Sequence, residues 1–242
     1  MSAVSGGERI LLTGPPHNTK AVVRIDTPEV VAVTVRLDIA GNASLHRGYV
    51  RPAGPGSSEV RLKLPRDTPA GQYRGEVKLG ETTHAIVVQV APNVRTRVNP
   101  KQSALSAEPG GRAEFDLIVS NDGNVAVDIV KSTTFDLDDG DGQDRALGIA
   151  LRADLAEDER RVDRFFDELR RSHGGEGRVS VIDGAGPLGP GESRSIRCRV
   201  EIPMTTAAGR SYVGTWRIGS TSHIVAVTVG KPVLRDTGRE TE

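Results

Sequence analysis

Apolar and polar residues alternate with a period of two along much of this chain. In the segment 31–39 every second residue is apolar, and the same alternation occurs at 60–64, 113–119 and 196–202. Because successive side chains of a β-strand point to opposite faces of a sheet, this pattern predicts strands with one buried and one solvated face. Proline, glycine and asparagine separate the segments, as in the turns of antiparallel sheets. The pattern therefore predicts an all-β protein.

An internal repeat gives the clearest information about domain organisation. Residues 64–90 and 202–229 align with a one-residue insertion. Turn, strand and aromatic residues match in the same order: Thr68 with Thr206, Gly71 with Gly209, Tyr73 with Tyr212, Gly75 with Gly214, Gly80 with Gly219 and His84 with His223. Each copy predicts a strand, a long turn and a hairpin, which is the usual C-terminal half of an Ig-like sandwich.

The repeat and the alternating segments before each copy predict two tandem Ig-like antiparallel β-sandwich domains. We expect the first domain at 6–92 and the second at 93–230, with an α-helical insertion at about 150–173. The segment 92–100, which begins and ends with proline, is the expected joint. Residues 231–242 form an expected polar tail.

Four segments of the second domain together resemble bacterial CARDB-type Ig-like modules. They are a proline-glycine turn at 108–111, a strand and Asn-Asp-Gly-Asn turn within 115–129, a second proline-glycine turn at 189–192, and the segment 202–214, IPMTTAAGRSYVG. The resemblance covers the second domain and the second half of the first. It implies a sandwich with a binding or spacer role rather than a reaction.

The insertion carries a helix signature over 154–173. Asp154 followed by Glu157 is typical of a capping box, and Gly174 is typical of a helix stop. Apolar residues at helical spacing share one face, with Phe165 at its edge: Leu155, Val162, Phe166 and Leu169. Two ion pairs at i,i+4 are expected to support the helix, Glu157 with Arg161 and Asp167 with Arg171.

Two uses of this helix remain open. It can cap one end of its own sandwich, since most apolar stripes on helices pack into a core. Alternatively, it presents a partner-binding surface made of Val162, Phe165, Phe166 and Leu169. The second hypothesis requires that these side chains are not fully buried within one chain.

Composition excludes several classes of partner. Lys plus Arg and Asp plus Glu both number 32, so the surplus of positive charge that nucleic-acid binding normally requires is missing. No stretch approaches the roughly 20 apolar residues of a membrane span, and no signal peptide is visible. Cys198 is the only cysteine, which excludes an internal disulfide. We therefore expect a cytoplasmic protein that binds no nucleic acid and has no membrane span.

Two motifs suggest ligand chemistry. Gly14 and Lys20 stand at the outer positions of a phosphate-binding loop, but Thr19 and Ala21 replace its second glycine and its hydroxyl residue, and a strand pattern follows. The acidic run at 136–144 carries carboxylates two apart between glycines, as in calcium loops, without the EF-hand spacing. A solvated loop and a calcium site both remain open for this run.

Three other residue types are interpreted as structural. His84 and His223 are expected at the rim of the sandwich, at the starts of equivalent strands. Cys198 lies on an inward-facing row and is expected in the core. Tyr73 and Tyr212 resemble the tyrosine that ties a strand to a neighbouring turn in Ig-like domains.

The sequence therefore predicts no enzyme, no cofactor and no metal. The favoured function is a non-catalytic protein-interaction or adaptor module, which binds another protein or a second copy of itself. The alternatives are a structural subunit of a self-assembling complex and a carbohydrate-binding module. The last is disfavoured because aromatic residues make up only 3% of the chain.

Overall fold

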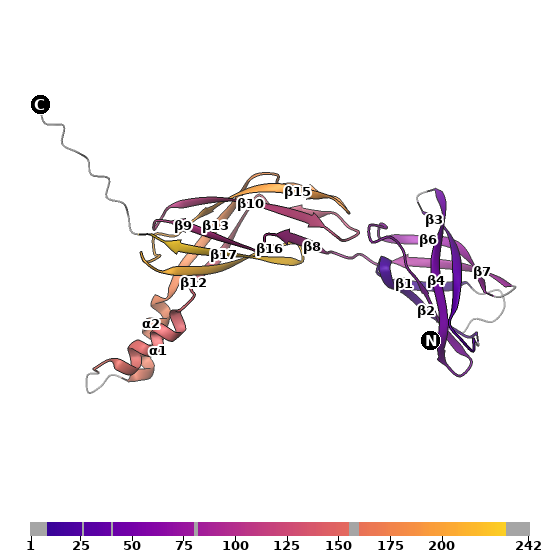
Figure 1. The fold of residues 1–242 in the computed structure, drawn as a ribbon, viewed down its shortest axis with the longest axis horizontal. Helices are drawn as coiled ribbons and strands as arrows, with labels where there is room; N and C mark the ends of the chain where they lie inside the picture. Colours follow the sequence, from indigo (N-terminus) through magenta and orange to yellow (C-terminus); the bar gives the residue numbers. More distant parts are fainter. Residues whose placement is uncertain (1–8, 26, 40, 80–81, 155–159, 231–242) are drawn as a thin grey trace, which may run out of the picture. The chain divides into compact units, whose positions relative to one another are not determined.

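The computed structural model describes residues 9–25, 27–39, 41–79, 82–154 and 160–230. Two compact units make up the chain: Met1–Thr96 with Asn121–Val127 and Leu188–Glu192 forms the first, and Arg97–Ser120, Asp128–Pro187 and Ser193–Glu242 form the second. The expected polar tail at 231–242 lies outside the described residues. Both units are built of β-strands, and two helices belong to the second (Figure 1).

The first unit is a seven-stranded antiparallel barrel closed by one parallel pair. The strands are β1 (Ile10–Gly14), β2 (Thr19–Val23), β3 (Val31–Ile39), β4 (Asn42–Gly54), β5 (Ser57–Leu62), β6 (Gly71–Leu79) and β7 (Thr82–Val90). Their order is β1-β2-β5-β4-β3-β6-β7, and β7 pairs in parallel with β1. A single 3-10 turn at Pro16–Asn18 joins β1 to β2.

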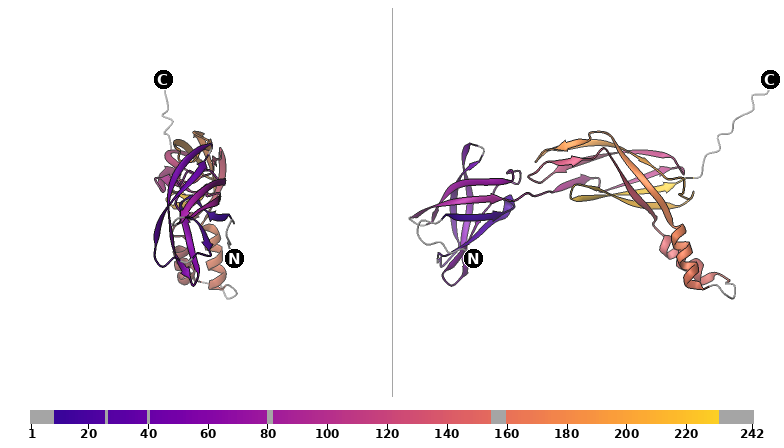
Figure 2. Two further views of the ribbon diagram at one scale, coloured as in Figure 1. Left: turned by 90° about the vertical axis from the view of Figure 1, so that its right-hand side faces the viewer. Right: turned by 180° about the vertical axis from the view of Figure 1, so that it is seen from behind.

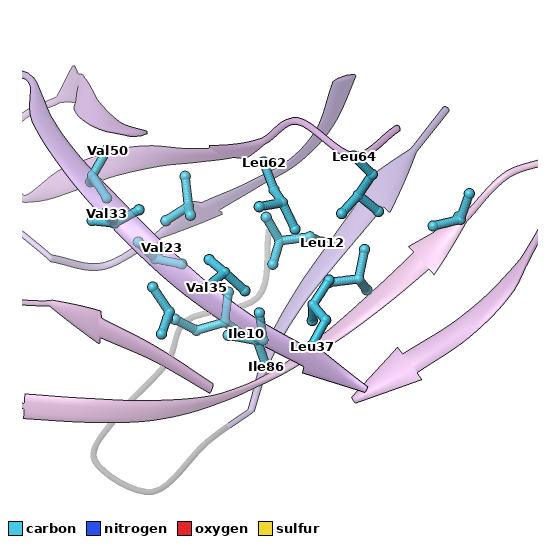
Figure 3. Close-up of a cluster of buried hydrophobic side chains, with 14 residues drawn as sticks. Ile10, Leu12, Val23, Val33, Val35, Leu37, Val50, Leu62, Leu64 and Ile86 are labelled. Atoms are coloured by element: carbon cyan, nitrogen blue, oxygen red, sulfur yellow. The ribbon is translucent and has the colours of Figure 1, made fainter. Parts of the chain in front are cut away.

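Period-two alternation fills the centre of this barrel. Along β3 the residues Val33, Val35 and Leu37 are buried while their neighbours are exposed, as the sequence predicts. Figure 3 shows these side chains meeting Ile10, Leu12 and Ile86 in one apolar cluster. Aliphatic side chains from all seven strands thus form the core, which agrees with a composition rich in valine and poor in aromatic residues.

The second unit repeats the same strand order. Its strands are β8 (Thr96–Asn99), β9 (Gln102–Ala107), β10 (Arg112–Asn121), β11 (Val127–Ile129), β12 (Ser132–Asp139), β13 (His173–Asp183), β14 (Gly186–Leu188), β15 (Ser193–Glu201), β16 (Ser211–Ile218) and β17 (Thr221–Val229). The large sheet runs β8-β10-β15-β13-β12-β16-β17-β9, with β11 and β14 paired separately. As in the first unit, the last long strand pairs in parallel with an early one, here β17 with β9.

Strand order shows that the fold prediction is correct. From β2 the first unit runs β2-β5-β4-β3-β6-β7-β1, and from β10 the second runs β10-β15-β13-β12-β16-β17-β9. Each strand of the first unit therefore has a counterpart in the second, which adds β8, β11 and β14. The chain is an all-β protein of two tandem Ig-like domains, the second with a helical insertion.

The matched tyrosines hold equivalent turns. Tyr73 donates a hydrogen bond from its hydroxyl group to the carbonyl of Pro69 at 2.7 Å, and the Tyr212 hydroxyl accepts one from the Ala207 amide at 2.9 Å. Each bond ties the start of a strand to the turn before it. The structural interpretation of these two residues is confirmed.

The matched glycines lie where a strand passes close to its neighbour. A Cβ atom at Gly75 would lie 2.1 Å from the carbonyl oxygen of Arg36, and one at Gly214 would lie 2.2 Å from Cδ2 of Phe135. Neither position has room for a side chain. The repeat conserves glycine here because β6 and β16 pass too close to their neighbours for any other residue.

The two matched histidines differ in their surroundings. His84 is half-buried, but His223 is fully buried rather than at the rim, so the prediction for His223 was wrong. Its Nδ1 lies 3.1 Å from the Pro100 carbonyl and its Nε2 3.2 Å from the Ser103 hydroxyl, and its ring stacks on Phe115. Strand β9 and its preceding turn cover this histidine, which the alternation of β17 alone does not reveal.

Glycine 214 gives a direct test of the close strand approach. Gly214→Ala is expected to lower the free energy of unfolding of the second domain by about 2–3 kcal/mol, because backbone and ring must move apart. Fluorescence of Trp216, the only tryptophan, follows this domain during urea unfolding. The control Gly230→Ala has nothing within 4 Å of the new Cβ and should stay near wild type. Equal stability of all three proteins would contradict the packing.

Histidine 223 predicts a pH dependence of stability. Burial lowers the pKa of His223, and its bond to the Pro100 carbonyl opposes this only in part. The unfolded chain therefore binds a proton at His223 more readily than the folded chain does. The contribution of neutral His223 to stability is fully present above a pH of about 6.5 and is lost as the pH falls from there toward the lowered pKa. The fall is about 1.4 kcal/mol for each unit between the two pKa values. In His223→Gln, Trp216 fluorescence should report a smaller loss of stability on acidification, and an identical slope contradicts the assignment.

Candidate interaction site

A helical hairpin replaces the turn between β12 and β13. Strands β12 and β13 pair as far as Asp138 and His173. Helix α1 (Gly142–Arg152) follows β12, and helix α2 (Arg161–Arg171) precedes β13. In Figures 1 and 2 the two helices project away from the end of the sandwich side by side. The sequence predicted one helix at about 150–173, and the structure has two shorter ones.

The predicted helix start differs from the observed one. Helix α2 begins after Arg160, which has extended backbone angles, so Asp154 does not cap it, and Glu157 and Leu155 lie outside the described residues. Gly174 belongs to β13 rather than to a helix stop. The predicted pair of Asp167 with Arg171 is also replaced, since Asp167 binds Arg170 at 3.1 Å and Arg171 binds Glu168.

Small residues of α1 allow the two helices to pack closely. Gly142, Ala146 and Ala150 recur every four residues and are buried. A Cβ atom at Gly142 would lie 2.5 Å from Cβ of Ser172, which fixes the contact at the base of the hairpin. Near the tip, Arg161 donates from Nη1 to the carbonyls of Ala150 (3.4 Å) and Leu151. The helices are therefore held to each other at both ends.

A buried carboxylate anchors the hairpin to the sandwich. The Asp139 side chain is 1% exposed and forms ion pairs with Arg145 of α1 and, at 3.5 Å, with Arg210. It also accepts a hydrogen bond from the Asp141 amide at 3.1 Å, while its own amide donates to the Ser172 carbonyl at 3.0 Å. One carboxylate thus links β12, α1 and the turn before β16.

An apolar surface remains open on the hairpin, and we call it the hairpin face. It consists of four large side chains that are 49–60% exposed: Leu147, Leu151, Val162 and Phe166. Phe165 and Leu169 are half-buried beside it, and no residue of α2, all of which is described, is buried. The helix therefore does not bury an apolar stripe in the core of its own sandwich. All four predicted site residues, Val162, Phe165, Phe166 and Leu169, lie on α2 within reach of solvent.

The opposite side of the hairpin is polar. A shallow hollow of about 460 Å³ lies between the helices and is lined by Arg145, Gly148, Ile149 and Arg164, with Asp144, Arg152 and Ala153. None of the four residues of the hairpin face lines it. The hairpin therefore has one charged side and one apolar side.

Two residues of the hairpin face were not predicted from the sequence. Leu147 and Leu151 belong to α1, which begins within the acidic run at 136–144 and ends within the range expected for the helix, about 150–173. Their spacing of four within ALGIAL is a helical signal. Glycines at 142 and 148 obscure it, since glycine is a poor helix former.

Two carboxylates of the acidic run, those of Asp138 and Asp139, pair with residues of the same domain. Asp136, Asp138 and Asp139 lie on β12, where Asp138 faces His173 at 3.1 Å between the carboxylate and Nδ1. Across the residues that the structure describes, no group of three or more His, Cys, Asp or Glu side chains is arranged to hold a metal ion. Asp139 is committed to two arginines.

The remaining motifs occupy structural positions. After Gly14 the chain forms the 3-10 turn and then β2, with Thr19 buried and its hydroxyl group donating to the Leu62 carbonyl at 3.0 Å, so no α-helix follows to bind phosphate. Cys198 is fully buried, and burial, with a smaller contribution from Asp116, raises the pKa of its thiol to about 12. A thiol of this kind is not a nucleophile. Neither helix of the described chain is long and apolar enough to cross a bilayer.

Comparisons with known proteins add little to this description. No family model matches the chain, and no curated protein matches it. Among solved structures, a protein of unknown function from Porphyromonas gingivalis W83 aligns over 91% of this chain and 96% of its own, at 12% identity and a TM-score of 0.30. A titin fragment aligns over 93% of this chain and 97% of its own, at 15% identity and a TM-score of 0.34. Domains 4 and 5 of the S-layer protein SbsC align over 84% of this chain and 100% of their own, at 16% identity and a TM-score of 0.29. Because these scores are low, the Ig-like assignment rests on the strand order.

The anchoring role of Asp139 predicts a stability change. Asp139→Asn is expected to lower the free energy of unfolding by about 1–3 kcal/mol, because a charge-assisted hydrogen bond to Arg145 and an ion pair with Arg210 are lost. Asp138→Asn is the matched control, since Asp138 is exposed and its pairing with His173 is worth at most about 1 kcal/mol. Urea unfolding followed by Trp216 fluorescence measures both. A larger loss in Asp138→Asn than in Asp139→Asn would exclude the anchor.

Proposed function

We propose that this chain is a non-catalytic protein-interaction module in which the hairpin face binds a partner protein. The observation that carries the proposal is the exposure of Leu147, Leu151, Val162 and Phe166 on two helices that are anchored at their base. Apolar patches of this kind on otherwise polar surfaces mark interaction sites. The proposed site keeps Val162, Phe165, Phe166 and Leu169 and adds the two leucines of α1.

The geometry supports a hot spot at Phe166. Its ring is half-exposed and packs edge-on against Phe165, with ring centres 5.5 Å apart, and Phe165 is itself half-buried. A partner that covers Phe166 gains the burial of an aromatic side chain that its neighbour already orients. Aromatic residues near the middle of an interface commonly carry most of its binding energy.

The sandwiches support this role as a scaffold. Asp139 and the Gly142–Ser172 contact hold the helices on the rigid end of a β-ladder, which limits the entropy lost on binding. The resemblance to CARDB-type modules, which implies a binding or spacer role, agrees with the proposal. Binding by a preformed helical face is a common mode of protein recognition.

Chemical crosslinking in the native lysate followed by affinity capture tests the proposal, because crosslinking also retains partners that dissociate on dilution. Wild-type protein is compared with Phe166→Asp and with Met204→Asp, a control at an apolar residue that is 78% exposed and lies outside the hairpin. We expect a partner to be retained by wild type and by the control, and to be lost at least about 30-fold in Phe166→Asp, as for a hot-spot residue.

Folding of each variant is checked by urea unfolding of the Trp216 signal. Because Phe166 is half-exposed, the variant should unfold at the same denaturant concentration as wild type. Equal capture by a folded Phe166→Asp protein would remove the hairpin face from consideration.

A further inference from the structure

We propose that the partner of the hairpin face is the same face of a second copy of this chain, so that two hairpins pack antiparallel into a four-helix bundle. This inference rests on the proposed function, because it names the occupant of the same surface. A two-fold symmetric interface requires a surface that is complementary to itself. The pattern of side chains on α2 and α1 meets this requirement.

The sequence of α2 is nearly palindromic. Residues 160–171 read RRVDRFFDELRR, and the same segment read backwards is RRLEDFFRDVRR. The centre of this pattern lies between Phe165 and Phe166. In an antiparallel pair of α2 helices, Phe165 therefore lies opposite Phe166 of the second copy, and Val162 lies opposite its Leu169. Every apolar position of α2 meets an apolar position.

The two leucines of α1 define a second centre. Leu147 and Leu151 are equally far from position 149, so an antiparallel pair of α1 helices places Leu147 opposite Leu151 of the second copy. The Gly142–Ser172 contact fixes the relative height of the two helices. Positions 149 and 165 are equally many residues from this contact, and therefore lie at the same height.

One two-fold axis consequently serves both helices. The centre of the α1 pattern lies level with position 165, and the centre of the α2 pattern lies between 165 and 166. The two differ by less than one residue, or less than about 1.5 Å along the helix axis. If the two patterns had arisen independently, this agreement in height would not be expected.

The four apolar residues lie on one side of the hairpin, as such packing requires. At 100° per residue, Leu147 and Leu151 lie on one side of the buried Ala146–Ala150 stripe, and Arg145 lies on the other. On α2, Phe166 and Arg164 likewise lie on opposite sides of Phe165. Because Arg145 and Arg164 line the same polar hollow, the remaining apolar residues share the opposite side.

The size of the hairpin predicts weak association. Each helix of 11 residues is about 16 Å long, so the buried area per chain falls well below the roughly 800 Å² of a standard interface. We expect a dimer that forms in the upper micromolar range and dissociates on dilution. Asp163, Asp167 and Arg170 place charges of both signs beside Phe166, which suits a solvated rim.

Sedimentation velocity tests the dimer on the full chain from about 5 to about 500 μM, a range that brackets weak interfaces. Wild type and Met204→Asp should shift from monomer to dimer with concentration, and Phe166→Asp should remain monomeric throughout. A monomeric wild type at the highest concentration overturns the proposal, and so does a dimer that persists in Phe166→Asp. If wild type stays monomeric but captures a different protein that Phe166→Asp loses, the self-pairing is overturned and the proposed function stands.

Disulfide crosslinking tests the antiparallel geometry. The buried Cys198 stays unreactive, so single cysteines can be introduced on the hairpin face. A mixture of Leu147→Cys and Leu151→Cys chains should crosslink with each other, because their Cα atoms face across the axis within the reach of a disulfide. Each variant by itself should crosslink at least about tenfold less than the mixture, because its two cysteines would be too far apart along the helices for a disulfide. Preferential crosslinking of each variant with itself indicates a parallel pair and contradicts the proposal.

Discussion

Two helices of 11 residues that pack mainly on each other can bury only one stripe of each, and this limit determines the surface of the second domain. Helix α1 fills its stripe with Gly142, Ala146 and Ala150, which bring the helices close but cover little of α2. Large apolar side chains on both helices are consequently left half-exposed. A hairpin that served only as a connection would gain solubility from polar residues at these positions, so their retention favours a role in binding.

The duplicated fold explains why the hairpin can be inserted without disrupting the strand pairing of the sandwich. In the first domain the equivalent strands β3 and β4 end and begin at Ile39 and Asn42, so a short turn joins them. In the second domain the same connection, between β12 and β13, carries both helices. Asp139 and Ser172 remain hydrogen-bonded at 3.0 Å where the insertion leaves the ladder. The ladder is thus closed below the helices, and no residue of α2 is buried in the sandwich core.

Sequence patterns predicted the elements that have one solvent-exposed face and one buried face. Alternation located β3, β5, β10 and β15, and the repeat located the hairpins β6–β7 and β16–β17. Strand β4 gave no such signal, because Val50 is its only fully buried residue. Helix α1 was missed because its buried stripe is made of glycine and alanine rather than large apolar residues. The burial of His223 depends on β9, which pairs with β17 across a long sequence separation that local patterns do not record.

The most direct measurement removes the hairpin and keeps everything else. Residues 140–171 are replaced by an Asn-Gly turn, which suits a two-residue connection between the paired residues Asp139 and Ser172, and both folding and association are measured on the product. If the hairpin is a recognition element on an independent scaffold, the Trp216 signal still shows cooperative unfolding, with a loss of stability no larger than that of Asp139→Asn, and concentration-dependent association disappears. A protein that no longer folds would show that the helices belong to the core. One that folds and still associates would place the interaction surface elsewhere.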